Sequence, residues 1–98
     1  MIGLEETAHI LVDALILLEQ FSLVETTIDS ATAASIASAI TNTKQWVSTF
    51  QSWMMTSGVG NNERMQANNH GSWFVSAYSS FAYFTGNATA QALASIMI

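Results

Sequence analysis

Apolar residues recur three and four positions apart along two long stretches of the chain, which is the spacing of helices that bury one face. The first stretch runs from Leu4 to Phe21, and most of its apolar residues are Leu and Ala. The second runs from about Ser30 to Thr56, where Asp29 or Ser30 can accept the free amide protons of the first turn. The apolar stripe of this second stretch is Ala33, Ile36, Ile40, Val47, Phe50 and Met54, with Trp46 and Trp53 beside it.

Turn residues and a shorter apolar stretch follow. Glycines and asparagines predict a loop over 57–62, because both residue types tolerate positive φ. Ser72 is placed to cap a third helix over 73–85, and Gly86 suits the position that ends it. The apolar residues in line on this helix are Trp73, Ala77, Phe81 and Phe84.

No part of the sequence alternates strictly between apolar and polar residues, so no strand is predicted. Asn87 can cap a fourth helix, from Ala88 onward, that reaches Ile98 without a stop signal. Ninety-eight residues fit one small domain at most. We therefore predict an all-α fold of antiparallel helical hairpins, and we interpret residues 1–98 as part of a domain whose remainder is missing.

Polar residues form a second stripe along the first helix, at Glu5, His9, Asp13 and Gln20. Such a stripe is either a solvated face or one wall of a groove. Charged stripes on amphipathic helices usually face solvent, so the solvated face is the favoured interpretation.

Seven acidic and two basic residues give the chain a net charge of −5. This balance disfavours nucleic acid and anionic membrane surfaces as partners. Residues 75–98 carry no charged side chain, but polar residues interrupt them and no basic flank follows. Glu5, Glu6 and Asp13 stand where a secretory signal would be basic or apolar. The sequence therefore predicts neither a membrane partner nor a signal peptide in these residues.

The run from Gln66 to Phe74 places two amides, an imidazole and a glycine directly before an aromatic segment. Removing the proton α to a uronic acid carboxylate needs hydrogen bonds that neutralise the carboxylate and a base that reaches the carbon. Asn69 can neutralise the carboxylate, and His70 can either neutralise it or act as the base. Gly71 would let the backbone turn and approach the sugar, and Trp73 offers a flat surface for stacking.

A structural role explains the same polar residues. A histidine beside asparagines at the start of a helix often belongs to a capping network that satisfies free backbone amides. The aromatic residues of the helices are likewise typical of a core before they are sugar platforms. Spacing alone does not decide between these two interpretations.

Between Trp46 and Gly86 the chain reads Trp-x6-Trp, then Thr-Ser-x-x-Gly-x-x-Glu, then Asn-Asn-His-Gly-Ser-Trp-Phe, and then an aromatic helix that closes with Thr-Gly-Asn. This segment resembles the alginate lyase family of polysaccharide lyases. The upstream run Gly3-Leu4-Glu5-Glu6-Thr7 also looks like that family, so the resemblance covers most of the chain from Ile2 to Ala92. Its Asn-Asn-His-Gly-x-Trp core is fairly specific.

The resemblance implies an incomplete α/α toroid and a β-elimination at a 4-linked uronate, without a metal or any other cofactor. It matches Asn69 with the asparagine that neutralises the carboxylate and His70 with the adjacent catalytic histidine. Asn68, Trp73 and Glu63 fall at positions that imply substrate binding. It also implies an acidic polysaccharide such as alginate as the substrate, and an extracellular or periplasmic location.

The chain also departs from the family pattern. Val75 and Ala77 stand where family members commonly have Asp and Gln, so a sugar contact or a buried hydrogen bond is expected to be lost. The arginine and tyrosine that complete such a site lie downstream in the family, and Tyr78 and Tyr83 are in the wrong segment to replace them. We therefore expect a lyase-like chain that is inactive by itself. The alternatives are a non-catalytic module that binds acidic carbohydrate or another helical protein, and a degraded gene product without a function.

Overall fold

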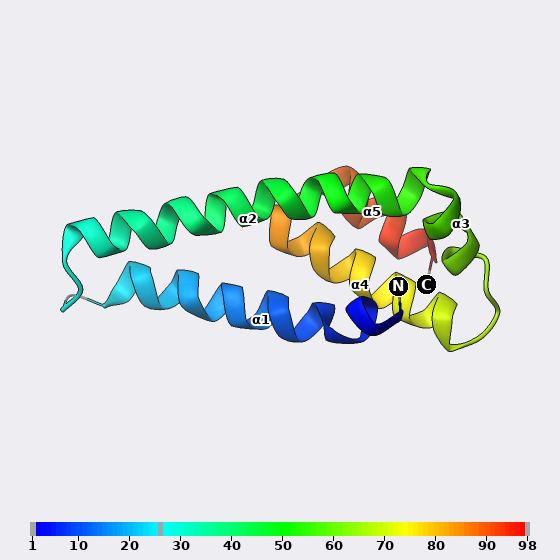
Figure 1. Ribbon diagram of the computed structural model, residues 1–98, viewed down its shortest axis with the longest axis horizontal. Coiled ribbons are helices and arrows are strands. Elements are labelled where there is room, and N and C mark those ends of the chain that lie inside the picture. Colours follow the sequence, from blue (N-terminus) through cyan, green and yellow to red (C-terminus); the bar gives the residue numbers. More distant parts are fainter. Residues whose placement is uncertain (1, 26, 98) are drawn as a thin grey trace.

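The computed structural model describes residues 2–25 and 27–97, and every regular element in these ranges is a helix (Figure 1). The helices are α1 (Ile2–Val24), α2 (Ser30–Thr56), α3 (Gly58–Arg64), α4 (Asn69–Thr85) and α5 (Ala88–Met97). The prediction of an all-α fold is confirmed for these ranges, and so are both long helices. The predicted last helix is confirmed as far as Met97, and Ile98 lies outside the described residues.

α1 and α2 run antiparallel as a long hairpin, and α4 lies against both of them in one half of the molecule (Figure 1). α5 packs on α4, and α3 lies between the end of α2 and the start of α4. The molecule is elongated, with extents of 49, 21 and 20 Å along its principal axes. α4 is the central element, because it contacts each of the other four helices.

The core is built around the buried side chains of α4. Its members are Phe74, Ala77, Tyr78, Phe81, Ala82 and Phe84 from α4, Ala8 and Val12 from α1, Val47 and Met54 from α2, and Ala90 and Ala94 from α5. The apolar stripes predicted for the second and third helices supply much of this set. Trp73 is the exception on α4, because it is only partly buried while the adjacent Phe74 is fully buried.

Three predicted helix caps are confirmed. Asp29 Oδ1 accepts a hydrogen bond from the backbone N–H of Thr32 at 2.6 Å and caps α2. Gly86 ends α4 with φ of 67°, a left-handed conformation that glycine adopts without steric cost. Asn87 Oδ1 accepts from the N–H of Ala90 at 3.0 Å, at the start of α5.

Two other boundary predictions are wrong. The segment predicted as a loop over 57–62 is largely α3, which Ser57 caps by accepting a hydrogen bond from the N–H of Gly60 at 2.9 Å. Gly60 is needed for close packing rather than for a turn, because a Cβ there would overlap the backbone carbonyl oxygen of Met54. α4 begins at Asn69 with Asn68 as its cap, one turn earlier than the start predicted from Ser72.

The half of the α1–α2 hairpin that α4 does not reach carries exposed apolar side chains, such as Leu17 at 70% and Leu23 at 74% exposure. Between Gly3 and Val24, α1 is long and apolar enough to cross a membrane, a property that core helices and signal sequences share. The absence of a membrane partner stays a prediction from charge.

Candidate active site

The asparagine–histidine run lies where the chain enters α4. Asn68 Oδ1 accepts a hydrogen bond from the backbone N–H of His70 at 3.0 Å, so the capping interpretation is confirmed for Asn68. Asn69 is the first residue of α4 and is exposed. Capping accounts for one side-chain oxygen of Asn68, but it does not account for the imidazole ring of His70.

The imidazole of His70 is held by a carboxylate from α3. His70 Nδ1 lies 3.0 Å from Glu63 Oε1 and 3.1 Å from Glu63 Oε2. The Glu63 side chain is 14% exposed and the His70 side chain 39% exposed, so the pair is covered on the glutamate side and open on the histidine side. An ionised carboxylate can only accept, so Nδ1 carries the proton, and in the neutral imidazole Nε2 then has the lone pair. This arrangement suits a histidine that takes up a proton at Nε2.

Glu63 is predicted from the sequence to bind substrate, and the structure places its carboxylate on His70. A carboxylate in this position orients the imidazole and stabilises the imidazolium that forms when Nε2 takes a proton. Direct sugar contacts of Glu63, Asn68 and Trp73 stay predictions.

A second carboxyl group, that of Glu5 in α1, lies close to this pair. Glu5 is 1% exposed, and no donor among the described residues hydrogen-bonds either of its carboxyl oxygens. Burial, together with repulsion from Glu63, raises the pKa of Glu5 to about 7. Two ionised carboxylates cannot donate to each other, whereas a protonated Glu5 can donate its proton to Glu63. Sharing one proton is therefore the favoured state of the two groups below about pH 7.

The prediction of a solvated polar stripe on the first helix is wrong for Glu5 and right for its other members, which are exposed. Glu5 is buried because α1 packs against α4. Glu5 also precedes the buried residues Ala8 and Val12 at helical spacing, which puts all three on one face of α1. This alignment with the apolar stripe is the signal by which the sequence could have revealed Glu5.

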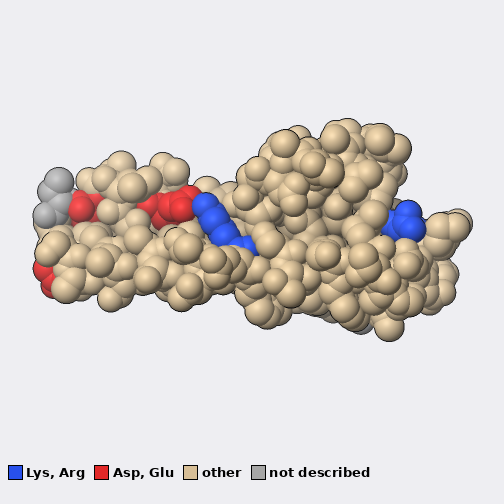
Figure 2. All heavy atoms as spheres, turned by 90° about the horizontal axis from the view of Figure 1, so that it is seen from above, with Lys and Arg blue, Asp and Glu red and all other residues tan. Residues whose placement is uncertain are grey.

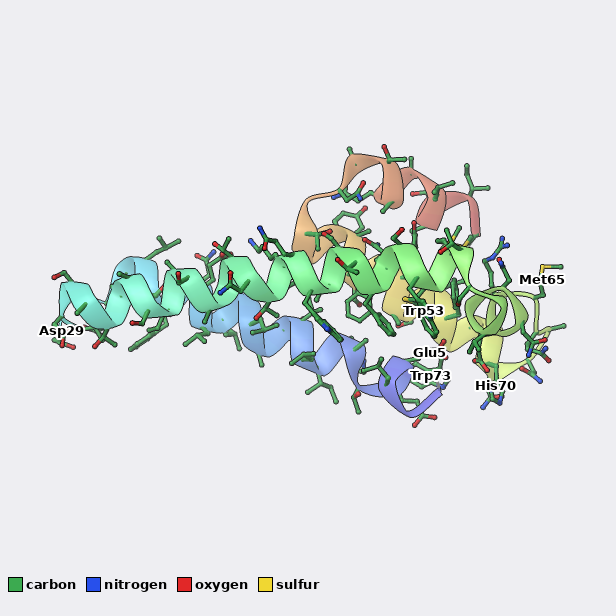
Figure 3. All side chains as sticks on the ribbon, turned by 45° about the horizontal axis from the view of Figure 1, so that its top comes forward. Glu5, Asp29, Trp53, Met65, His70 and Trp73 are labelled. Atoms are coloured by element: carbon green, nitrogen blue, oxygen red, sulfur yellow. The ribbon has the colours of Figure 1, made fainter. Side chains whose placement is uncertain are left out.

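Trp73 lies about one turn after His70 on α4, and its ring stacks on His9 of α1. The two ring centroids are 6.3 Å apart and the ring planes differ by 18°. Figure 3 shows Glu5, Trp73 and His70 at the same end of the molecule, opposite Asp29. The structure thus brings the predicted sugar platform and the predicted histidine to one end, with a face of the tryptophan engaged by α1.

A surface hollow of about 320 Å³ adjoins the start of α4. Its polar lining includes Arg64, Gln66, Asn68 and Ser72. These side chains offer hydrogen-bond donors and a positive charge, and none of the described residues that line the hollow is a carboxylate. The lining therefore suits an anionic, hydroxyl-rich ligand.

The two basic residues of the chain differ in their surroundings. Lys44 Nζ pairs with Glu19 Oε2 at 3.2 Å. Arg64 Nη2 donates to the neutral Asn61 Oδ1 at 2.8 Å, and Arg64 Nε is buried without a partner among the described residues. Figure 2 shows acidic side chains of one face gathered over the far part of the hairpin and a basic side chain at the opposite end, where α3 lies.

The fold and the site together define a class of protein, an all-helical one in which an exposed asparagine and a carboxylate-held histidine open the same helix. Among residues 2–25 and 27–97, no group of three or more His, Cys, Asp or Glu side chains could hold a metal ion. The chain belongs to the alginate lyase family, whose family model matches residues 2–95. The resemblance carried by the motifs is therefore confirmed for the family. Comparisons with curated proteins and with solved structures found no match.

The raised pKa of Glu5 makes the stability of the fold depend on pH. The ordinary pKa of a glutamate is 4.5, and that of Glu5 in the folded protein is about 7. The folded state binds this proton more tightly than the unfolded state does. The contribution of Glu5 to the free energy of unfolding is therefore fully present below pH 4.5 and is lost as the pH rises through 7. The loss is about 3 kcal/mol, since one pKa unit corresponds to about 1.4 kcal/mol.

We expect Glu5→Gln to remove most of this pH dependence, because the amide cannot ionise. Urea unfolding of both proteins at about pH 5 and about pH 8 measures the difference. Glu6→Gln is the matched control, since Glu6 is the exposed neighbour on α1. Equal losses of stability in the wild type and in Glu5→Gln between the two pH values would contradict the argument from burial.

Proposed function

We propose that the chain carries the asparagine and histidine of a lyase that cleaves 4-linked uronate polymers, such as alginate, by β-elimination. Family membership supports a polysaccharide lyase-like function and an acidic polysaccharide as the substrate. The observation that carries the proposal is the imidazole of His70, whose Nδ1 lies 3.0 Å from Glu63 and whose Nε2 is left to take a proton.

In the proposed reaction the side-chain amide of Asn69 donates to the carboxylate of the uronate and withdraws charge from it. Nε2 of His70 takes the proton from C5, and the electron pair of that bond forms the double bond between C4 and C5. The bond from C4 to the glycosidic oxygen breaks, and this oxygen leaves with the electron pair and must gain a proton. Glu63 stabilises the imidazolium of His70 during the step.

No tyrosine of the described chain is assigned to protonate the leaving oxygen. Tyr78 is buried in the core, and at 1.5 Å per residue it lies roughly 12 Å along α4 from His70. Tyr83 is exposed but lies more than three turns from His70 on the same helix. The family resemblance puts this role on a tyrosine downstream, together with an arginine, and we therefore propose that the 98-residue chain alone is inactive.

We further propose that these helices are part of an incomplete α/α toroid in an extracellular or periplasmic protein. The exposed apolar residues of α1, such as Leu17 and Leu23, support further helices packed on this hairpin. α1 and α2 are antiparallel neighbours, which is the unit from which such a toroid is built.

A second candidate function is a module that binds acidic carbohydrate without cleaving it. The hollow beside Asn68 favours it, since Arg64 in its lining has no carboxylate partner among the described residues. An uronate carboxylate could form a charge-assisted hydrogen bond with this guanidinium. Binding would then need no base and no leaving-group acid.

The test is made on the complete product of the reading frame that contains these residues. It is incubated with polymers of mannuronate, guluronate and glucuronate, and unsaturated sugar ends are followed by their ultraviolet absorbance. We expect turnover on at least one polymer. The absence of unsaturated ends on all three would contradict the lyase, and calorimetric binding of acidic oligosaccharides without turnover would favour the binding module.

A further inference from the structure

Glu5 is a buried ionisable group that the proposed elimination does not use. No donor among the described residues hydrogen-bonds either of its carboxyl oxygens, and the residue is 1% exposed. An ionised carboxylate is strongly disfavoured in such surroundings unless a cation or several donors compensate it. Glu6, directly after it, is exposed, so α1 does not need a buried acid for its own solubility or its helix dipole. The reason for a buried acid at this position therefore lies in the groups that surround Glu5.

The charged groups that act on Glu5 come from several elements. Burial raises the pKa of Glu5 most. Repulsion from Glu63 of α3 and a hydrogen bond from the protonated Glu5 to Glu63 raise it further, whereas the amino terminus and His70 of α4 lower it. His9, one turn further along α1, has its ring stacked on a tryptophan of α4. Lys44, the charged residue of α2, is paired with Glu19 of α1. Glu63 is thus the group through which Glu5 can reach the imidazole.

We propose that Glu5 is a positioning residue, which in its protonated form donates a hydrogen bond to the Glu63 carboxylate and so holds that carboxylate on His70 Nδ1. The positioning role of Glu5 rests on the proposed lyase function, whereas the proposed hydrogen bond from Glu5 to Glu63 does not. With one proton shared between the two glutamates, the pair carries a single negative charge. Nδ1 then stays protonated and Nε2 stays the basic nitrogen. Without the shared proton, two neighbouring carboxylates repel each other and Glu63 is no longer held.

The tautomer of His70 reports this role, because the 15N shifts of an imidazole show which nitrogen carries the proton. A His9→Gln variant assigns the signals of the two histidines. We expect the Nδ1-protonated form in the wild type and in Glu5→Gln, whose amide still donates to Glu63. Glu5→Leu removes the donor, so a mixture of tautomers is expected. Identical tautomer populations in Glu5→Leu and the wild type would overturn the proposal, since a purely structural Glu5 would leave His70 unchanged.

A second measurement holds even if Glu5→Leu does not fold. The 13C shift of the Glu5 carboxyl is followed against pH in the wild type and in Glu63→Gln, which removes the neighbouring charge and offers an amide donor instead. The titration midpoint of Glu5 is expected to fall by about half a pH unit or more. An unchanged midpoint would show that the two groups do not share a proton. Glu6→Gln is the control that should leave the Glu5 midpoint in place.

Neither measurement depends on turnover, so the two proposals can fail separately. A protein that shows the expected tautomers and midpoints but cleaves no uronate polymer keeps the contact and loses the lyase. A protein that cleaves a polymer but shows no coupling keeps the lyase and loses the role of Glu5.

Discussion

The His70→Gln variant of the complete protein is expected to cleave a uronate polymer about 10² to 10⁴ times more slowly than the wild type, because a glutamine cannot take up the C5 proton. Asn69→Ala is expected to lose about 10² to 10³-fold, because the uronate carboxylate loses a donor that neutralises it in the transition state. The initial rate of ultraviolet absorbance gives kcat/KM for each protein. Both variants should lower kcat as well, since these interactions strengthen in the transition state.

Asn62→Ala is the matched control for these variants, since Asn62 is an exposed asparagine of α3. It should keep the wild-type rate. Circular dichroism of each variant shows whether the helices are retained. A folded His70→Gln variant with the full rate would remove His70 from the reaction and leave family membership untouched. A full rate in Asn69→Ala would move the neutralising role to another donor.

Gly71→Ala is expected to destabilise the fold by about 2 to 3 kcal/mol, although alanine in a helix interior is favoured over glycine by about 1 kcal/mol. A Cβ at Gly71 would overlap the backbone carbonyl oxygen of Gln66. No flexible side chain is involved, so the backbone of α4 and the segment before it must move apart. The sequence interpretation gave Gly71 a sharp turn towards the sugar, whereas Gly71 is a buried helical residue of α4 that permits this close packing.

The free energy of unfolding in urea measures the effect of Gly71→Ala. Gly3→Ala is the control, because Gly3 is also helical and a Cβ there would meet no atom within 4 Å. The control should be neutral or slightly stabilising. Because Glu63 and His70 lie on opposite sides of the segment that must move, Gly71→Ala should also weaken their hydrogen bond. A Gly71→Ala protein as stable as Gly3→Ala would contradict the packing argument.

The helices and several of their ends could be predicted from the sequence because their causes are local. Apolar spacing predicts α1 and α2, and Asp29, Gly86 and Asn87 act on residues within one turn of themselves. α3 was not predicted, since glycine and asparagine indicate loops when only local preference is considered. Its formation depends on α2, because Gly60 packs on the backbone of Met54.

Some features of the candidate site are likewise local in the sequence, and others depend on how the helices pack. A motif in one short run of sequence makes Asn69 and His70 the catalytic candidates. Asn68 fits the capping role that spacing alone allowed. The partnership of Glu63 with His70 and the burial of Glu5 depend on how α1, α3 and α4 pack. Periodicity along one helix shows which face carries a residue, but it does not show what covers that face.

α4 supplies half of the core residues and also begins with Asn69 and His70, so the helix at the centre of the described fold also carries the proposed catalytic residues. A substitution at Phe74 or Phe81 that shifts this helix would also move the imidazole against Glu63. Selection for greater stability and selection for a different substrate would therefore act on the same few helical turns. Thermostable variants chosen without an activity screen should often show altered rates.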